Sequence, residues 1–576
     1  MLLALLTNLL LLVTSPLRLL RRAFVSPRKG YVLLEIDGRV VDNAPPRPRL
    51  LARWTQPQKP PPLTLVAMHE VARLLAADAR LEGLVVRVRS LAAGQSVLAS
   101  MRAVLAKLRD AGKDVVVHAP MGADSDVMFL ASGAKRIVVG PETHVAPLGY
   151  AVEMSFFKRA LDRIGVEPQV FARGTYKSAA EPLVREDMSS AQREQLEEVI
   201  GTRHALLVEA LAERCGGDRA KAAEWIDTGP HRASQAVELG LVDHVAYDDE
   251  LDGLLGAPHG KRARFVAFGR YHRIKRPTKW RPLWPRPVVG LVEVHGPIVS
   301  QVRFSMGAIA SEHAVVRAIR AARVNPRIAA VVLHVDSPGG SAIASDRIHH
   351  EVERLASEKP VVAYLSNVAA SGGYYVAAPA RAIVAQPQTI TGSIGVVATH
   401  FVLRGLLDKL GVSTDVVKRG ARADLNSPVR PLEDAERSVL EREVDAFYKT
   451  FVSVVARGRK RSVEDIEKLA QGRIYSGTEA LARGLVDELG GLDRAIERAT
   501  DLAGYRRLEP VIVRPTRFSI PPPPPIPRVA ETMLAAVGLD RIVGERLALG
   551  LNVAQTELVL LYEPFGSDGR TWLDVT

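Results

Sequence analysis

An internal repeat constrains the fold more than any other feature of the sequence. Residues 113–174 and 359–420, placed under each other without a gap, are identical at 19 of 62 positions. Downstream, AVELGLVD at 236–243 matches ALARGLVD at 480–487. A chain of 576 residues is also too long for one hydrophobic core. We therefore expect a tandem duplication of one domain.

Each copy alternates short apolar runs, such as VVLHV and PVVAYL, with amphipathic stretches such as SDRIHHEVERLASE. Strands that alternate with helices indicate βαβ units and a largely parallel sheet. A longer helical region follows in each copy, at 189–215 and 433–458. The predicted fold class is α/β.

Proline- and arginine-rich segments divide the chain. One of them, 44–62, is an insertion found in the first copy only, and SIPPPPPIPR at 519–528 is a stiff polyproline spacer. The predicted parts are a membrane anchor or interfacial helix (1–28), a first repeat (29–265), a linker (266–287), a second repeat (288–510), and a proline-rich spacer with a C-terminal tail (511–576).

Composition argues against a nucleic-acid site, a disulfide framework and a metal or cofactor site. The net charge is +13, but the basic residues are scattered among 64 acidic ones, which favours a solvated surface over a nucleic-acid site. The only cysteine, Cys215, excludes an intrachain disulfide framework and a cysteine-rich metal site. No cluster of metal ligands stands out along the sequence, so we expect neither a metal nor a cofactor.

The N-terminal residues 1–17 carry no charge, and Arg18, Arg21 and Arg22 follow. As one helix this run would span about 25 Å, slightly short of a bilayer core of about 30 Å. No small-residue cleavage site ends it, so an uncleaved anchor or interfacial helix is the preferred interpretation. The basic flank by itself would place the body of the protein on the cytoplasmic side.

Two segments of the second copy are suited to acyl chemistry. In DSPGGS, Gly339 and Gly340 follow a predicted strand, where backbone N–H groups without side chains can approach an oxyanion. In AASGGYY, Ser371 stands between a predicted strand and a predicted helix, followed by Gly372. A serine at such a turn is exposed, and the helix N-terminus favours negative charge.

A nucleophilic serine needs a base. His334, His349 and His350 lie near DSPGGS in the sequence, but no acidic residue stands at a sequence spacing from them that indicates a Ser-His-Asp arrangement. Lys177 in GTYKSAAEP lies among small, uncharged residues. A lysine can accept the proton if burial lowers its pKa from about 10.4 towards neutrality, and Ser-Lys pairs are a known variant of the serine nucleophile.

DSPGGS, NVAASGGYY, TGSIGV and GTYKSAAEP together resemble the long, duplicated form of the signal peptide peptidase A (protease IV) family, peptidase family S49. The resemblance covers about residues 30–505 and implies a ClpP/crotonase-like ββα fold. It implies Ser371 as nucleophile, Lys177 as general base and Ser393 as the residue that positions the lysine. It also implies a membrane-anchored homotetramer whose body lies on the periplasmic side of the inner membrane, and we prefer this side over the one indicated by the basic flank.

The two copies differ at these positions in a reciprocal way. Ser371 aligns with Ser125, but AASGG has become ADSDV, and Gln95 stands where the second copy has a glycine. Conversely, Lys177 aligns with Ala423. One composite site per chain explains this pattern better than two independent sites. Whether the site closes within one chain or between neighbouring chains is left open by the sequence.

The sequence therefore predicts a membrane-associated serine endopeptidase that degrades apolar peptides, such as cleaved signal peptides. Gly339, Gly340 and Gly372 are the candidate oxyanion donors. Two alternatives stand beside this prediction. One is a crotonase-type acyl-CoA enzyme, which shares the architecture, and the other is a non-catalytic membrane scaffold of the same fold.

Overall fold

A computed structural model describes residues 2–27, 29–43, 62–276, 286–300, 309–513 and 559–561. The chain divides into two compact units. Unit 1 consists mainly of Met1–Ala151 and Ile200–Arg286, and unit 2 mainly of Val152–Val199 and Pro287–Ser567. The polyproline spacer and all but the last residue of the 44–62 insertion lie outside the described residues.

Unit 1 is built on a parallel sheet with the strand order β10-β6-β4-β3-β1-β11. Helices α4 (Leu65–Ala76) and α5 (Gln95–Asp110) bury apolar side chains against one face, and α12 (Leu251–Gly256) covers the other. The strands are β1 (Gly30–Val41), β3 (Leu81–Ala92), β4 (Asp114–Ala119), β6 (Arg136–Val139), β10 (His244–Val245) and β11 (Phe265–Ala267), with β2 (Leu63–Thr64) beside β1.

Unit 2 repeats this plan. Its main sheet has the order β21-β19-β17-β15-β12-β23, with β18 and β22 joined beside β17. Here β12, β15 and β17 correspond to β1, β3 and β4, so the predicted α/β class and tandem duplication are confirmed. The strands are β12 (Val288–His295), β15 (Ile328–Ser337), β17 (Val361–Ala370), β18 (Ala382–Ala385), β19 (Ile390–Gly392), β21 (Ile474–Ser476), β22 (Glu488–Leu489) and β23 (Glu509–Ile512).

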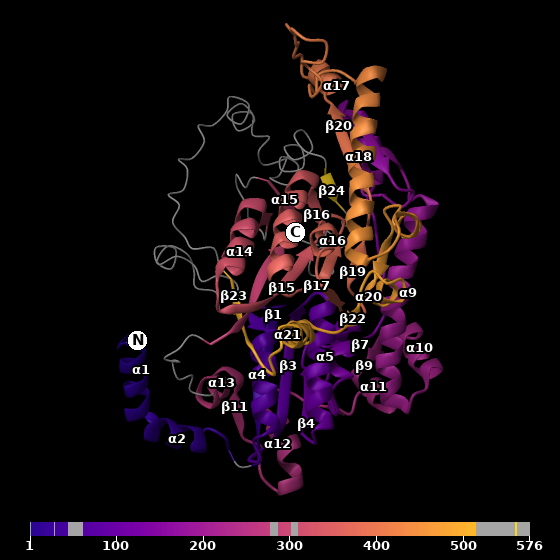
Figure 1. The fold of residues 1–576 in the computed structure, drawn as a ribbon. Helices are drawn as coiled ribbons and strands as arrows, with labels where there is room; N and C mark the ends of the chain where they lie inside the picture. The colour runs from indigo at the N-terminus through magenta and orange to yellow at the C-terminus, as the bar shows by residue number, and fades with distance from the viewer. Residues whose placement is uncertain are drawn as a thin grey trace. The chain divides into compact units, whose positions relative to one another are not determined.

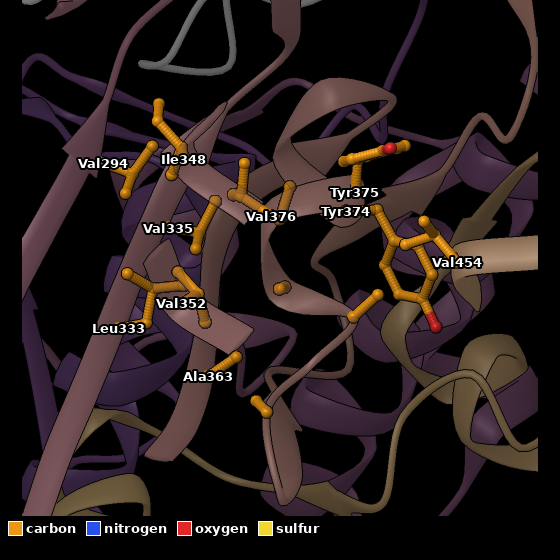
Figure 2. Close-up of a cluster of buried hydrophobic side chains, with 14 of the residues drawn as sticks. Val294, Leu333, Val335, Ile348, Val352, Ala363, Tyr374, Tyr375, Val376 and Val454 are labelled. Atoms are coloured by element: carbon orange, nitrogen blue, oxygen red, sulfur yellow. The ribbon is translucent and has the colours of Figure 1, made fainter. Parts of the chain in front are cut away.

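The central strands of unit 2 are buried on both faces, which explains their continuous apolar sequences. On one face, Val294 lies beside Ile348 and Leu333 beside Val352, both of helix α15 (Ala342–Glu358), as Figure 2 shows. The other face packs against α21 (Leu492–Leu502). Helices α14 (Glu312–Val324) and α15 (Ala342–Glu358) lie next to each other over the first face (Figure 1). Each fully buried Val or Leu stabilises the fold by about 1.5–3 kcal/mol.

A second sheet of unit 2 joins the two repeats of the sequence. Its order is β14-β13-β16-β24-β20-β8, and β8 (Glu167–Arg173) runs antiparallel to β20 (Val396–Val402). β8 lies in the first repeat of the sequence, and β20 lies in the second. Because these two strands pair, residues 152–199 belong to the unit that otherwise contains the second repeat. The other strands are β13 (Ile298–Val299), β14 (Ala310–Ser311), β16 (Gly339–Ser341) and β24 (Val559–Leu561).

The predicted long helical regions are α9 (Ser190–Ala212) and α18 (Asp434–Arg459). A small sheet of β5 (Ala123–Asp124), β7 (His144–Ala146) and β9 (His231–Arg232) completes unit 1. The shorter helices are α6 (Ser125–Ala131), α7 (Lys158–Ile164), α8 (Glu181–Val184), α10 (Arg219–Asp227), α11 (Ala233–Glu238), α16 (Gly372–Ala377), α17 (Arg404–Lys409), α19 (Val463–Leu469) and α20 (Gly477–Ala482).

The segment predicted as a linker, 266–287, is in part a helix. Helix α13 (Phe268–Lys275) packs on unit 1, where Tyr271 is fully buried and its hydroxyl donates to Asp78 at 3.3 Å. The buried aromatic ring and its hydrogen bond explain why this part is ordered structure. Residues 277–285 lie outside the described residues.

The N-terminal run forms two helices, α1 (Leu2–Val13) and α2 (Ser15–Phe24), instead of one. Proline in the first turn of α2 suits a helix start, because its missing N–H has no partner there anyway. Within the described residues, none of the helices combines the length and the apolar character that crossing a membrane requires.

Candidate active site

Ser371 stands at the sharp turn between β17 and α16. Its backbone has φ 54° and ψ −120°, a conformation that few residues other than glycine adopt. The turn is held because the Ser371 N–H donates to the Gly392 carbonyl at 2.8 Å and the Tyr375 N–H donates to the Ser371 carbonyl at 2.9 Å. Such strain costs about 1–3 kcal/mol and is typical of functional positions.

The structure brings Lys177, Ser371 and Ser393 together within one chain. The Lys177 Nζ lies 2.9 Å from the Ser371 Oγ and 2.9 Å from the Ser393 Oγ. It also donates to the Ser393 carbonyl at 3.2 Å. All three residues are buried, so the expectation that Ser371 is exposed at its turn is wrong. The lysine therefore has an oriented partner on one side and a candidate nucleophile on the other, which is the geometry of a nucleophile and its base.

Burial lowers the pKa of Lys177 to about 7. The cause is desolvation, because taking the ammonium out of water disfavours its charged form. At neutral pH a large fraction of such a lysine is uncharged. An uncharged amine has the lone pair needed to accept the hydroxyl proton of Ser371.

Two glycines allow the Lys177 turn to approach a distant segment. The Tyr176 N–H donates to the Gln471 carbonyl at 2.8 Å. Gly472 has φ +75°, and a Cβ there would lie 2.6 Å from the Lys177 N and 2.7 Å from its Cβ. Gly174 has φ +107°, and a Cβ there would lie 2.4 Å from the carbonyl carbon of Gln471. A side chain at either position would therefore displace the lysine.

Gln195 on α9 also positions this turn. Its buried amide Nε2 donates to the Tyr176 carbonyl at 3.2 Å and to the Ser178 Oγ at 2.9 Å. Its Oε1 accepts from the Ile474 N–H at 3.3 Å. Sequence reasoning missed Gln195 and Gly472, because neither belongs to a motif and only the tertiary structure brings them to Lys177.

The three candidate oxyanion glycines differ in their contacts. The Gly339 N–H donates to the Ser337 Oγ at 3.2 Å. Gly340 has φ +148°. A Cβ on Gly372 would lie 2.5 Å from the Ser345 Oγ and 3.4 Å from the Gly340 N. The backbone of Gly340 therefore lies close to the start of α16, beside Ser371, and a side chain on Gly372 would fill the space between them.

The histidines considered as alternative bases have other surroundings. The His349 ring packs against Tyr375, with ring centroids 5.1 Å apart. The His334 ring lies against Tyr364 and His295, with centroids 5.2 Å and 4.4 Å away. His350 is exposed on α15. The hydrogen-bond partner of the Ser371 hydroxyl in this site is Lys177.

The corresponding region of unit 1 is closed by side chains. The Ser125 Oγ donates to the Gly149 carbonyl at 3.0 Å. Asp126, which aligns with Gly372, accepts from the Gln95 Nε2 at 3.0 Å and from the Tyr150 hydroxyl at 3.2 Å. Burial raises the pKa of Asp126. A carboxylate and an amide thus occupy the positions that glycines hold in unit 2.

Comparison with known proteins supports a peptidase. A family model described as peptidase family S49 matches residues 107–253 and 353–506. The serine protease SPPA of Arabidopsis thaliana chloroplasts is 31% identical over 486 residues, which cover 83% of this chain and 70% of that protein. Protease 4 of Salmonella typhi is 31% identical over 499 residues, which cover 83% of this chain and 79% of that protein.

Among solved structures, a ClpP1 mutant from Listeria monocytogenes aligns with 36% of this chain and 94% of its own, at 16% identity and a TM-score of 0.24, which is too low to compare the sites. The family match and the two relatives establish the family and the type of enzyme. The chain belongs to peptidase family S49, and it is a serine peptidase.

Proposed function

We propose that the chain is a Ser-Lys endopeptidase with one composite site, formed by Ser371, Lys177 and Ser393. The 2.9 Å distance between the Lys177 Nζ and the Ser371 Oγ, with the lysine buried, is the observation that carries this proposal. Hydrogen bonds to Ser393 fix the ammonium or amine in place. Serine and base are therefore oriented before substrate arrives, which lowers the entropic cost of reaction.

In the proposed course, neutral Lys177 accepts the hydroxyl proton as the Ser371 Oγ attacks the scissile carbonyl carbon. The oxyanion that forms lies near the amides of Gly340 and Gly372, which are the proposed donors. The protonated lysine then gives its proton to the leaving amine, and an ester to Ser371 remains. Water, deprotonated by the same lysine, cleaves the ester and releases the second product.

An activity-based fluorophosphonate probe tests this proposal on the full chain. We expect labelling of Ser371, identified by mass spectrometry of the labelled peptide, and little labelling of a Lys177→Ala variant. Ser125→Ala is the matched control and should label like the wild type. Absence of labelling at Ser371 in a folded wild-type chain would favour the scaffold alternative.

The proposed substrates are apolar peptides bound as an extended strand. β24 supports this mode, because Val559–Leu561 run antiparallel to β16 and pair with β20 at Val397. An added strand binds through main-chain hydrogen bonds and is therefore tolerant of sequence. We expect a synthetic peptide of residues 556–563, TELVLLYE, to compete with a fluorogenic substrate, and a proline at the position of Leu560 to weaken this competition.

The proposed membrane association rests on the surfaces of α1 and α2. The side chains of Leu9, Leu10 and Phe24 are 58%, 61% and 76% exposed. Exposed apolar surface beside arginines is typical of an interfacial helix. Removing residues 1–25 should move the protein from the membrane fraction to the soluble fraction. A truncated chain that stays with membranes through a carbonate wash would contradict this assignment.

Signal peptides as substrates, a homotetramer and a periplasmic location remain part of the proposal, supported by the family resemblance. Light scattering of the purified protein tests the assembly, with four chains of 62.5 kDa expected per particle. Protease protection of intact and opened cells tests the side of the membrane. Cleavage of a radiolabelled signal peptide tests the substrate.

A further inference from the structure

Three metal-ligand side chains meet on one face of the main sheet in unit 2. Glu293 and His295 are two residues apart on β12, so they point to the same face. His334 on β15 stands opposite Glu293 in the strand register. The potential ligand atoms of these three residues all lie within 4.8 Å of one another. Within the ranges that the structure describes, they are the one such group of three.

We propose that Glu293, His295 and His334 bind a divalent transition-metal ion of the Zn²⁺ type. Two imidazoles and one carboxylate are a common zinc ligand set, with metal–ligand distances of about 2.0–2.2 Å. Glu293 and His295 are half-buried, so binding would require their side chains to turn towards His334 until the three ligand atoms surround one ion. The fourth position is left for water or another small ligand.

The surroundings of the group favour a cation. Asp336 stands opposite His295 in the strand register, so a further carboxylate lies close to the cluster. That carboxylate is held in place, because it accepts from the Asn367 Nδ2 at 3.0 Å and from the Val368 N–H at 3.2 Å. His334 is fully buried between His295 and Tyr364, which fixes its ring. Oriented ligands with charged neighbours are typical of metal sites.

The first copy supplies a second argument. Its residue in the position of Glu293 is Glu35, which stands opposite Arg87 in the register. The Arg87 Nη1 lies 3.1 Å from the Glu35 Oε1. In unit 1, the guanidinium of Arg87 thus provides the positive charge beside Glu35. Unit 2 has His334 instead, and a bound metal ion would take the place of the guanidinium between the two strands.

The proposed site lies just before the candidate oxyanion segment. From His334, β15 continues to Ser337, and β16 begins at Gly339. A metal ion would tie the end of β12 to the end of β15. We therefore expect bound metal to stabilise unit 2 against unfolding. The inference does not depend on the Ser-Lys proposal, because metal binding is measured directly and not through peptide cleavage.

Calorimetric titration of the full-length, EDTA-treated protein with Zn²⁺ tests the proposal. We expect one high-affinity ion per chain and a rise in the unfolding temperature on binding. Glu293→Gln and His295→Asn should each weaken binding at least tenfold, which is the usual scale even for outer-shell partners. The matched control is His350→Asn, which removes an exposed histidine of the same unit and should leave binding unchanged.

His334→Arg is the most informative variant, because it introduces the residue of the first copy. We expect it to fold, with Glu293 paired to the new guanidinium, and to lose the zinc-dependent rise in unfolding temperature. Co²⁺ adds a spectroscopic readout, since its visible absorption reports nitrogen and oxygen ligands. A wild-type chain that binds no Zn²⁺, or variants that bind it as tightly as the wild type, would overturn the proposal.

Discussion

The two copies of the domain place different chemistry on the same backbone plan. In unit 2, Gly340 and Gly372 carry no side chains, and a Cβ at 372 would lie 3.4 Å from the Gly340 N. In unit 1, Gln95 and Asp126 stand at the corresponding positions and hydrogen-bond to each other at 3.0 Å. The difference teaches that side chains at these positions are compatible with the backbone plan in unit 1, whereas in unit 2 a Cβ at 340 would lie 2.1 Å from the Ile298 carbonyl oxygen. Close packing against Ile298 therefore explains Gly340, and Gly372 is the position where a side chain would block a ligand that approaches the backbone.

The comparison also shows which repeat contributes the lysine of the proposed site. The first repeat provides Lys177 on a segment that packs within unit 2, through β8 and β20. The second repeat has Ala423 at the aligned position, in a turn that carries no lysine. The proposed composite site needs only one serine and one lysine, so one copy could lose the surroundings of its serine and the other its lysine.

The largest expected effect comes from the proposed dyad. Ser371→Ala and Lys177→Ala should each lower kcat/KM by about 10⁴-fold or more, and the double variant should be no worse, because residues that act as a unit are not additive. Peptide cleavage with a fluorogenic substrate measures this.

Ser125→Ala, the equivalent serine in unit 1, is the control and should keep wild-type activity. Mixing the two inactive variants in one oligomer should restore nothing, because the structure closes the site within one chain. A Lys177→Ala enzyme that keeps most of its activity would refute the dyad and return the histidines to consideration.

Exchanging residues between the copies should have the next largest effect. Gly372→Asp introduces the residue of unit 1, and we expect kcat to fall by about 10²-fold or more, the usual scale for losing an oxyanion donor. A Cβ at 372 would lie 2.5 Å from the Ser345 Oγ. The double variant Gly372→Asp/Ser345→Ala lacks this oxygen, so the steric contact is removed while the aspartate stays.

Gly340 is less suitable for such an exchange, because a Cβ there would lie 2.1 Å from the Ile298 carbonyl oxygen. The reverse exchange, Asp126→Gly in unit 1, is the matched control and should leave kcat unchanged. Equal losses from both exchanges would mean that the effect is structural.

Activity should depend on the ionisation of Lys177. Burial lowers its pKa to about 7, and in the proposed mechanism the working form is the neutral amine. Below that pH, kcat/KM should therefore fall about tenfold per pH unit, and above it the profile should level off. A pH profile from 5 to 9 on a neutral peptide measures this. Activity that stays constant between pH 5 and 7 would show that another group is the base.

The smallest effect expected is at Gly472. Gly472→Ala places a Cβ 2.6 Å from the Lys177 N and should lower kcat by about tenfold by moving the lysine, with KM little changed. Gly484→Ala is the matched control, since Gly484 has a similar φ of +74° and its Cβ would meet only the Arg461 Nη1 at 3.5 Å. Both variants should lose about 1 kcal/mol of stability from the backbone strain, and Gly472→Ala should lose more because of its contact with Lys177. Only Gly472→Ala should lose activity.

Much of the fold could be predicted from the sequence, because the duplication and the alternation of apolar runs with amphipathic stretches are local patterns. The long helices α9 and α18 were predicted within a few residues. The N-terminal run was predicted as one helix, whereas the structure ends α1 at Val13 and begins α2 at Ser15. Periodicity alone does not distinguish one uninterrupted apolar helix from two shorter ones.

The sequence by itself determined the class, the duplication and the motifs that contain Ser371, Lys177 and Ser393, since each motif is a short run with its own chemistry. Only the tertiary structure decided what those residues contact. The pairing of β8 with β20 brings Lys177 across 194 residues to Ser371, and Gln195 and Gly472 reach it from other parts of the chain. The register of β12 with β15 likewise joins Glu293 and His295 to His334. Strand pairing and side-chain packing are long-range, so no local pattern encodes these contacts.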